Sequence, residues 1–298
     1  MAGELTKRVA VAAVGVPLAV AVLYAGGWVL GSVLALLAAG GAAELYRLAA
    51  QRGTHAFAGA GALLAGGMVV VAALLPDEPS VSRVQWLAAF AAALVLGAAA
   101  IWRRGIEGSP LVATAVSVFG ALFVGGAFSY VVLLRHLDGG DAAAGLTPLQ
   151  GTTLVAYPIT LAWIGDTCAY FGGRAWGRRR LMPSVSPGKT VEGAIAGLVG
   201  TVSIGAVYAW LVFRGWVGLP IGPLAGALGG LLVSPAAQIG DLAESLLKRE
   251  AGVKDSGRLL PGHGGILDRF DSLFFAVPTA YWYLAAVLPW WVEGLPWR

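Results

Sequence analysis

Long apolar runs, each bounded by charged, Gly or Pro residues, follow one another along almost the whole chain. About 20 mostly apolar residues are needed to cross roughly 30 Å of hydrocarbon, so each run predicts a membrane-spanning helix. We expect nine spans, at residues 9–24, 28–43, 57–75, 85–102, 110–134, 151–171, 191–213, 222–247 and 273–292. The pattern therefore predicts an all-α, polytopic membrane protein.

The first two runs are short and are separated by only Ala25, Gly26 and Gly27. They form either a tight helical hairpin or segments that lie partly in the membrane interface, and eight spans is the alternative count. A cleaved signal peptide that begins with Lys7 and Arg8 is a competing interpretation. No clean cleavage site separates the two runs, so we expect this segment to remain in the protein.

The composition excludes several classes of protein. Of the 298 residues, 58% are hydrophobic and 12% are charged, whereas a soluble domain has about 25% charged residues. A soluble enzyme, a disordered chain and a secreted disulfide scaffold are therefore excluded. The single cysteine, Cys168, forms no intramolecular disulfide and is too isolated for a thiolate metal site. The net charge of +4 does not sit on a soluble domain with exposed aromatic residues, so we expect no nucleic acid partner.

The basic residues are distributed unevenly between the two sides of the expected bundle. With nine spans, sixteen of the 20 Lys and Arg residues fall on the side of the amino terminus. Basic residues concentrate in cytoplasmic loops, so we expect a cytoplasmic amino terminus and an outer carboxy terminus in the cell (inner) membrane. The two long polar loops, at about 172–190 and 248–272, then face the cytosol, and we expect the active site at this interface.

Acidic residues inside apolar runs are costly and indicate function. Asp166 lies in one run, and Asp241 and Glu244 lie in another. Asp166 is eight residues before Arg174 and Asp241 is seven before Lys248, so both carboxylates lie roughly 10–12 Å below the cytoplasmic loops at 1.5 Å per residue. We expect the two aspartates to meet. A buried salt bridge between helices is the alternative explanation for Asp241 and Glu244.

The end of the 222–247 run and the loop after it combine carboxylates with fixed cations. Ser245 and Lys248 follow Asp241 at i+4 and i+7, on one helix face. This combination suits Mg²⁺-assisted phosphoryl or nucleotidyl transfer, because oxygen ligands hold the hard cation and basic side chains neutralise phosphate oxygens. We expect Asp268 and Asp271, three residues apart, on one helical face. His263, among glycines, either binds phosphate or holds the loop.

The 172–190 loop carries a second set of candidates. We expect a turn at Ser186-Pro187-Gly188, and Thr190 as the cap of the next helix. Arg174 and Lys189 flank these features and are candidates for phosphate binding. Membrane anchoring and contact with anionic lipid explain the arginine run at 178–180 without catalysis.

Residues 245–271, SLLKREAGVKDSGRLLPGHGGILDRFD, resemble the signature of the phosphatidate cytidylyltransferases, or CDP-diglyceride synthases. Every fixed position of that signature is matched. The segments GDTCAYFGGR, SPGKTVEG and QIGDLAES are similar to further segments of the family. The resemblance is specific over residues 163–272 and is only a general match of hydropathy before them.

The resemblance implies a membrane enzyme that makes CDP-diacylglycerol and pyrophosphate from CTP and phosphatidic acid, with Mg²⁺ as cofactor. Asp241 and Asp268 match its metal-binding carboxylates, and a second metal ion or a monovalent cation is left open. The other catalytic candidates are Lys248, Arg249, Lys254, Asp255, Arg269 and Asp271. The substrate-binding candidates are Asp166, Arg174, Ser186, Lys189, Ser245 and His263. We expect residues 1–150 to form a transmembrane scaffold and residues 151–298 the catalytic region.

Two other functions are compatible with acidic residues in membrane helices. A CTP-dependent lipid-alcohol kinase would release CDP instead of pyrophosphate. A secondary transporter would place its acidic residues near the midplane between inverted repeats, and we detect no repeat. The GxxxG-like pairs Gly193 with Gly197 and Gly226 with Gly230 suit helix packing within one chain or in a homodimer.

Overall fold

The computed structural model describes the backbone of residues 2–137, 145–257 and 264–292, and the side chains of 13–137, 145–257 and 264–286. The candidate His263 lies outside the described residues. The chain divides into two compact units, Met1–Leu133 with Leu246–Phe270 and Leu134–Ser245 with Asp271–Arg298. Most of the signature segment, residues 245–271, which we call the signature loop, therefore groups with the amino-terminal helices. The functional division expected at residue 150 stays a prediction.

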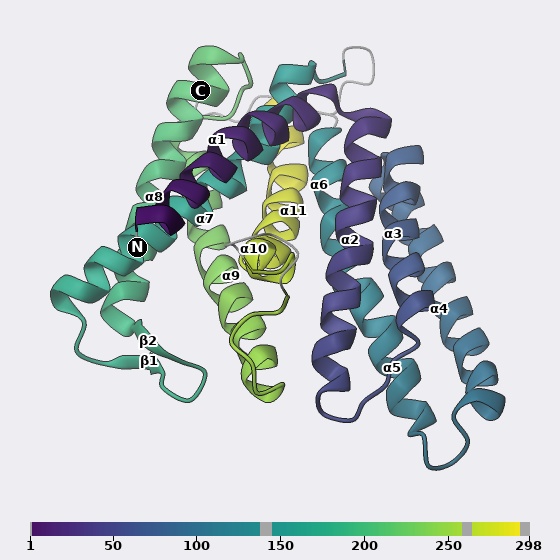
Figure 1. Ribbon diagram of the computed structural model, residues 1–298. Helices are drawn as coiled ribbons and strands as arrows, with labels where there is room; N and C mark the ends of the chain where they lie inside the picture. Colours follow the sequence, from purple (N-terminus) through teal and green to yellow (C-terminus); the bar gives the residue numbers. More distant parts are fainter. Residues whose placement is uncertain (1, 138–144, 258–263, 293–298) are drawn as a thin grey trace. The chain divides into compact units, whose positions relative to one another are not determined.

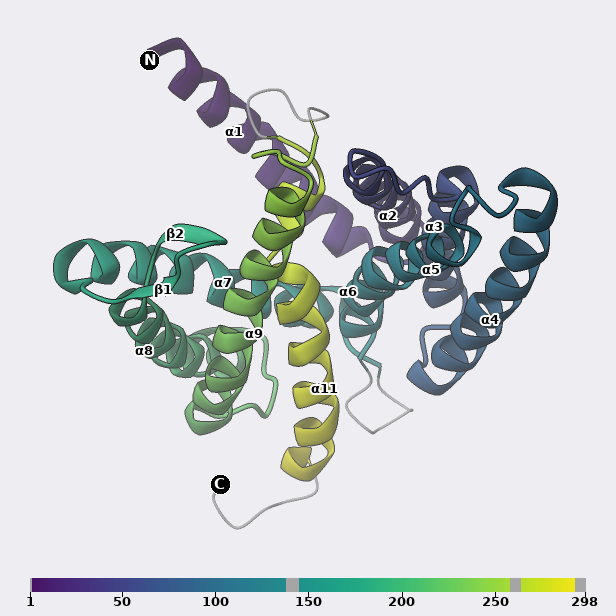
Figure 2. The same ribbon diagram turned by 90° about the horizontal axis from the view of Figure 1, so that it is seen from below.

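The first unit is built from helices that follow one another along the chain. They are α1 (Ala2–Ala25), α2 (Gly27–Ala50), α3 (Ala58–Leu74), α4 (Glu78–Arg103), α5 (Pro110–Gly120), the π-helix η1 (Ala121–Gly126) and most of α6 (Ala127–Arg135), with the short α10 (Leu267–Phe270). α2, α3, α4 and α5 lie side by side (Figures 1 and 2). Gly26 joins α1 to α2 with a φ of 60°, a conformation that favours glycine.

The second unit combines long helices with a small hairpin. It contains α7 (Pro148–Trp176), β1 (Arg180–Met182), β2 (Ser186–Thr190), α8 (Val191–Tyr208), the π-helix η2 (Ala209–Trp216), α9 (Pro223–Glu250) as far as Ser245, and α11 (Leu273–Val292). Thr147 and Gln150 form a capping box that starts α7. α7 and α8 pack closely, with Gly172 facing Ala196 and Gly193 facing the carbonyl oxygen of Ala169.

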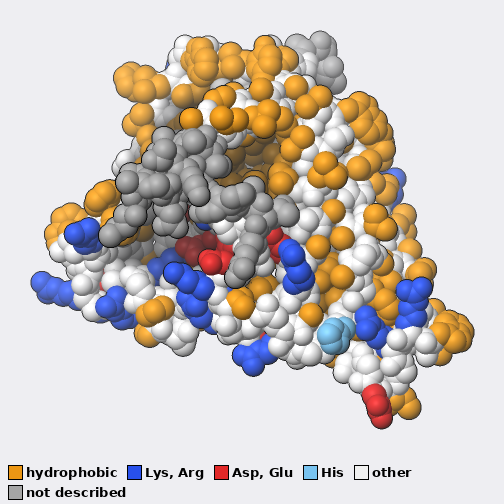
Figure 3. Space-filling view, viewed as in Figure 1, with side chains coloured by type: hydrophobic (Ala, Val, Ile, Leu, Met, Phe, Trp, Pro, Cys, Tyr) orange, Lys and Arg blue, Asp and Glu red, His pale blue; other side chains and the backbone are white. Residues whose placement is uncertain are grey.

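Each of the nine apolar runs coincides with a helical segment in the described part of the chain. Five helices there are long and apolar enough to cross a membrane: Gly27–Ala50, Glu78–Arg103, Pro110–Arg135, Val191–Trp216 and Pro223–Glu250. On α4 the side chains of Trp86, Leu94 and Trp102 are exposed. Figure 3 shows hydrophobic side chains over the helices of the first unit. The chain is a helical membrane protein. The count of nine spans stays a prediction.

The expected turn at Ser186-Pro187-Gly188 is wrong, and the all-α expectation needs a correction here. These residues belong to β2, which pairs antiparallel with β1 in the register Arg180↔Thr190 and Met182↔Ser186. The turn lies at residues 183–185, where the Val185 N–H donates to the Met182 carbonyl at 3.2 Å. Pro183 therefore occupies the second position of the turn, which its fixed φ favours.

Asp268 and Asp271 do not share a helix, so the expected common face is also wrong. α10 ends at Phe270 and α11 begins at Leu273. The N–H of Ser272 donates to the Asp271 carboxylate, and the Ser272 carbonyl accepts the N–H of Ala276. Short polar side chains compete in this way with helical hydrogen bonds, and here they break the helix before α11 starts.

Candidate active site

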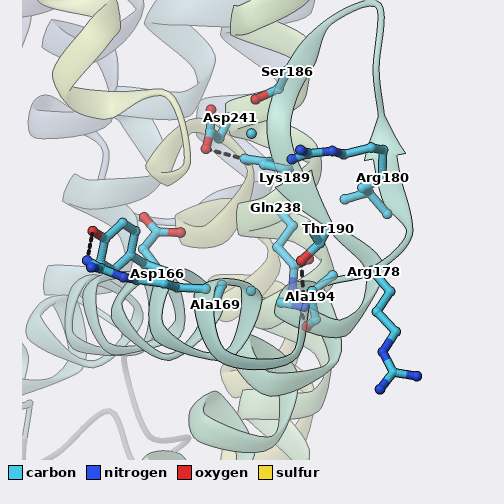
Figure 4. Close-up of a pocket in the computed structure, with 17 residues that line it drawn as sticks. Asp166, Ala169, Arg178, Arg180, Ser186, Lys189, Thr190, Ala194, Gln238 and Asp241 are labelled. Carbon is cyan, nitrogen blue, oxygen red and sulfur yellow. Dashed lines mark hydrogen bonds and ion pairs between the residues drawn. The ribbon is translucent and has the colours of Figure 1, made fainter.

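A pocket of about 840 Å³ opens in the second unit among α7, the β1–β2 hairpin, α8 and α9 (Figure 4). Asp166 on α7 and Asp241 on α9, which we expected to meet, both line it. Its other polar and charged lining residues are Tyr170, Arg174, Arg178, Arg180, Ser186, Lys189, Thr190 and Gln238. The predicted residues 166, 174, 186, 189 and 241 thus lie around one pocket.

Lys189 and Asp241 form an ion pair on the wall of the pocket (Figure 4). Their side chains are 27% and 26% exposed, so both groups remain accessible from the pocket. The Oγ of Ser245, one helical turn along α9, donates to the other Asp241 carboxylate oxygen at 3.4 Å. Lys189 is the fourth residue of β2, so the hairpin delivers this cation to the carboxylate on α9.

The hairpin is held at both ends by the first turn of α8. Thr190 caps α8, with its Oγ1 accepting the Gly193 N–H at 3.1 Å, as predicted. The Glu192 carboxylate accepts the N–H groups of Arg178 and Arg179 at 3.0 and 3.1 Å and the Arg179 Nε at 3.0 Å. Sequence reasoning missed Glu192, although an acidic residue in the first helical turn is a known favourable pattern.

Basic side chains outnumber carboxylates around the pocket. Arg174 donates to the Tyr170 hydroxyl at 3.3 Å, and Arg180 donates to the Pro187 carbonyl at 2.8 Å. Arg178 also lines the pocket, but its side chain extends away from Asp166 and Asp241 in Figure 4. Figure 3 shows Lys and Arg side chains gathered around the hairpin. A cleft lined by an excess of cations attracts anionic ligands, such as those that carry phosphate groups.

Asp268 is the centre of a second cluster, in the first unit. Its Oδ1 pairs with the Lys248 Nζ at 2.8 Å. Its Oδ2 accepts the N–H groups of Ser256 and Gly265 at 2.9 and 2.8 Å and lies 3.0 Å from the Ser256 Oγ. Burial raises the pKa of Asp268, but the Lys248 contact and the backbone N–H groups outweigh it and the pKa lies below its ordinary value. The carboxylate is therefore ionised and held from both sides.

The other predicted residues of the loop are less enclosed. Four of them have exposed side chains: Arg249, Lys254, Asp255 and Arg269. Asp271 is half-buried.

A residue that the sequence did not single out reaches the same loop from α2. Glu44 is completely buried, and its Oε2 accepts the Ser256 Oγ at 2.9 Å and the Leu267 N–H at 3.0 Å. The predicted span ended at residue 43, so Glu44 counted as a polar boundary. An acidic residue directly after an apolar run was the available signal.

The donor groups can be compared with the needs of Mg²⁺, which is usually bound by one or two carboxylates together with substrate phosphates. Among the described residues no group of three or more His, Cys, Asp and Glu side chains forms a metal cage. Asp166 and Asp241 supply two carboxylates to a pocket lined by cations, which fits Mg²⁺ carried by a nucleotide. The Oδ1 of Asp268 pairs with Lys248, and a carboxylate oxygen can accept more than one partner, so this oxygen is suited to a further ligand.

Comparison with known proteins identifies the family to which the chain belongs. Residues 6–287 match the model of the Cytidylyltransferase family. A phosphatidate cytidylyltransferase of Synechocystis sp. is 34% identical over 304 residues, which cover 95% of this chain and 98% of that protein. The enzyme of the same name from Bacillus subtilis is 42% identical over 165 residues, 55% of this chain and 56% of that protein. The one from Haemophilus influenzae is 44% identical over 141 residues, 46% and 47% of the two chains. The chain belongs to the cytidylyltransferase family.

Proposed function

We infer that the protein is a phosphatidate cytidylyltransferase, which transfers CMP from CTP to phosphatidic acid and releases pyrophosphate. The observation that carries this inference is the family match over residues 6–287, supported by the Synechocystis relative over 95% of the chain. The pocket lined by basic side chains and two carboxylates is suited to the two anionic substrates.

The chemistry requires charge neutralisation more than proton transfer. A phosphate oxygen of the lipid attacks the α-phosphorus of CTP, the bond between this phosphorus and the α,β-bridging oxygen breaks, and pyrophosphate leaves. The attacking phosphate is already ionised, so no general base is needed. Two polyanions repel each other, and fixed cations at the reacting phosphates lower this barrier. Lys189 and Arg174 are assigned to this task in the pocket, together with Ser186 as a hydrogen-bonding group.

The signature loop supplies further cations. We assign four of its residues to binding substrate phosphates: Lys248, Arg249, Lys254 and Arg269. Asp255 and Asp271 are assigned to orienting these basic side chains. Lys248 is the best defined of the four, because its ammonium is fixed by Asp268 at 2.8 Å and its side chain is only 14% exposed. A cation that is already oriented loses little freedom when it binds a phosphate oxygen.

Magnesium is the proposed cofactor, with Asp241 and Asp268 as its protein ligands and Asp166 as a neighbour of Asp241. When bound, the ion neutralises phosphate charge and orients the leaving group. A second metal ion or a monovalent cation belongs to the same proposal. Ser245 holds Asp241 through the 3.4 Å contact, so its assigned role is to orient that carboxylate.

The membrane supplies one substrate and the cytosol the other. CTP is soluble, whereas phosphatidic acid stays in the leaflet, so only the interface serves both. The concentration of basic residues on one side supports a cytoplasmic amino terminus, cytoplasmic catalytic loops and an outer carboxy terminus. A homodimer also stays a prediction, because the glycines considered for it pack within the chain: Gly197 faces Gly165 and Gly226 faces Gly205.

The experiment that tests the function is pyrophosphate release by the purified protein in detergent, with CTP, phosphatidic acid and Mg²⁺ omitted one at a time. We expect release that needs both substrates and yields a CDP-lipid. Release without Mg²⁺ would refute the cofactor proposal alone. Formation of CDP from CTP with a lipid alcohol would instead indicate a kinase, and the absence of both products would leave a transporter or an inactive relative.

The metal assignment has its own test. Asp241→Asn and Asp268→Asn remove a charged oxygen while preserving side-chain size, and we expect kcat to fall about 10²–10³-fold, as for loss of a group that stabilises the transition state. The measurement is turnover at saturating Mg²⁺, with thermal unfolding as the control for folding. Near-normal turnover in either folded variant would remove that residue from the metal site.

A further inference from the structure

We propose that Glu44 on α2 is a positioning residue for the transfer reaction. Its buried carboxylate holds Ser256 and Leu267, and these contacts fix the loop that presents Lys248 and Asp268. The proposal rests on the proposed function, which assigns Lys248 and Asp268 to the reaction. It gives the amino-terminal helices a part in catalysis that goes beyond a membrane scaffold.

The burial of Glu44 is the first argument. The residue is 0% exposed, and burying a carboxylate is costly unless it is hydrogen-bonded. Its Oε2 meets this need with the Ser256 Oγ at 2.9 Å and the Leu267 N–H at 3.0 Å. Its Oε1 lies 3.8 Å from the Arg47 guanidinium, one helical turn away. Both hydrogen bonds come from the signature loop, so the buried charge is stabilised by that loop.

The close fit of the loop backbone around Glu44 is the second argument. A Cβ atom at Gly257 or Gly265 would collide with the Glu44 carboxylate. One turn earlier on α2, a Cβ at Gly40 would collide with the side chain of Ile266. Glycine permits such close backbone approach, so this face of α2 and the loop are matched in shape. The loop is thereby fixed against α2 at residues 256–257 and at residues 265–267.

The third argument is the connection from Glu44 to Asp268. The Ser256 Oγ lies 2.9 Å from the Glu44 Oε2 and 3.0 Å from the Asp268 Oδ2. A hydroxyl donates only one hydrogen, but Asp268 also accepts the N–H groups of Ser256 and Gly265. The hydroxyl is therefore available to Glu44 while the backbone holds Asp268. Asp268 in turn orients the Lys248 ammonium at 2.8 Å.

The test compares three variants in the pyrophosphate-release assay and in thermal unfolding. Glu44→Ala removes both hydrogen bonds, and we expect kcat to fall at least about 10-fold, since small misplacements of reacting groups are costly. Glu44→Gln keeps an oxygen that can accept both bonds, so its kcat is expected within about threefold of the wild type. The matched control is Tyr46→Phe, on the same helix as Glu44, which removes a buried 2.6 Å hydrogen bond from the Tyr46 hydroxyl to the Ser117 carbonyl of α5.

The control separates positioning from stability. We expect Tyr46→Phe to lower the unfolding temperature and to leave kcat unchanged. If Glu44→Ala is folded and has the kcat of Tyr46→Phe, Glu44 is only structural and the proposal is wrong. If Glu44→Gln is as inactive as Glu44→Ala, the charge rather than the hydrogen bonds is required, and positioning through this network is also wrong.

A second pair of variants serves if Glu44→Ala does not fold. Ser256→Ala removes the bridging hydroxyl, and we expect its kcat to fall several-fold. Ser256→Thr keeps a hydroxyl, and we expect it to retain the kcat of the wild type. Wild-type kcat in Ser256→Ala would overturn the proposal. A wild-type protein that makes no CDP-lipid would instead refute the proposed function, so the two failures are distinguishable.

Discussion

The ion pair between Lys189 and Asp241 joins the hairpin to α9 inside the pocket. Each group neutralises the other in the protein alone, and a nucleotide phosphate in the pocket would compete with Asp241 for Lys189. We predict that Lys189→Met lowers kcat/KM for CTP about 10²-fold, because one fixed cation at a developing charge is worth a few kcal/mol. The measurement is steady-state pyrophosphate release at varied CTP.

A neighbouring arginine provides the control for that prediction. Arg179 pairs with Glu192 and is not among the residues that line the pocket, and its side chain is 70% exposed. Exposed ion pairs contribute little to stability, so Arg179→Met is expected to keep kcat/KM within about threefold. Equal losses in both variants would mean that overall charge, rather than the position of Lys189, governs CTP use.

The residues that the sequence predicted differ from Glu44, a buried residue that it missed, in their surroundings along the chain. Asp166 and Asp241 lie well inside apolar runs, where any charge is anomalous, so they could be identified without a structure. Glu44 follows its run directly and looked like an ordinary boundary. Its partner Ser256 lies 212 residues away, and no local pattern predicts a contact at that separation.

At the scale of elements, the α7–α8 pair depends on glycines that admit close backbone contact. A Cβ at Gly193 would lie 2.8 Å from the Ala169 carbonyl oxygen, whereas a Cβ at Gly67 on α3 meets nothing within 4 Å. We predict that Gly193→Ala destabilises the protein by about 1–3 kcal/mol through overpacking. Gly67→Ala is expected to be neutral or stabilising, by up to roughly 1 kcal/mol. The measurement is the half-life of each variant in detergent at a fixed elevated temperature. Equal half-lives of Gly193→Ala and Gly67→Ala would contradict the packing argument.

Helices were predictable along this chain, whereas connections were not. Apolar runs bounded by Gly, Pro and charge defined every long helical segment of the described chain to within several residues. The 172–190 loop contains two prolines, Pro183 and Pro187, and either could have marked a turn. Only the pairing of Arg180 with Thr190 shows that the turn is at Pro183. The break between α10 and α11 depends likewise on local hydrogen bonds of Asp271 and Ser272, which spacing alone does not reveal.

At the scale of the whole molecule, sequence order is a poor guide to the compact units. Leu246–Phe270 belongs with the amino-terminal helices, where the Phe270 ring packs on Phe128 at 4.9 Å between centroids and Leu267 binds Glu44. The sequence predicted a catalytic carboxy-terminal half because the chemistry-bearing residues lie there. The contacts of the signature loop nevertheless involve α2, so truncation of the first 150 residues would remove support from that loop.

The orientation in the membrane can be tested with single cysteines, because Cys168 is the only native one. In a Cys168→Ala background we predict that Gly188→Cys, on the exposed hairpin, reacts with a membrane-impermeant maleimide only in inside-out vesicles. Pro220→Cys, in the exposed loop before α9, is expected to react only in right-side-out vesicles. The reason is the excess of basic residues in the loops on the side of Gly188. Labelling of both positions from one side would refute the span assignment between them, and the reverse pattern would refute the cytoplasmic placement of the catalytic loops.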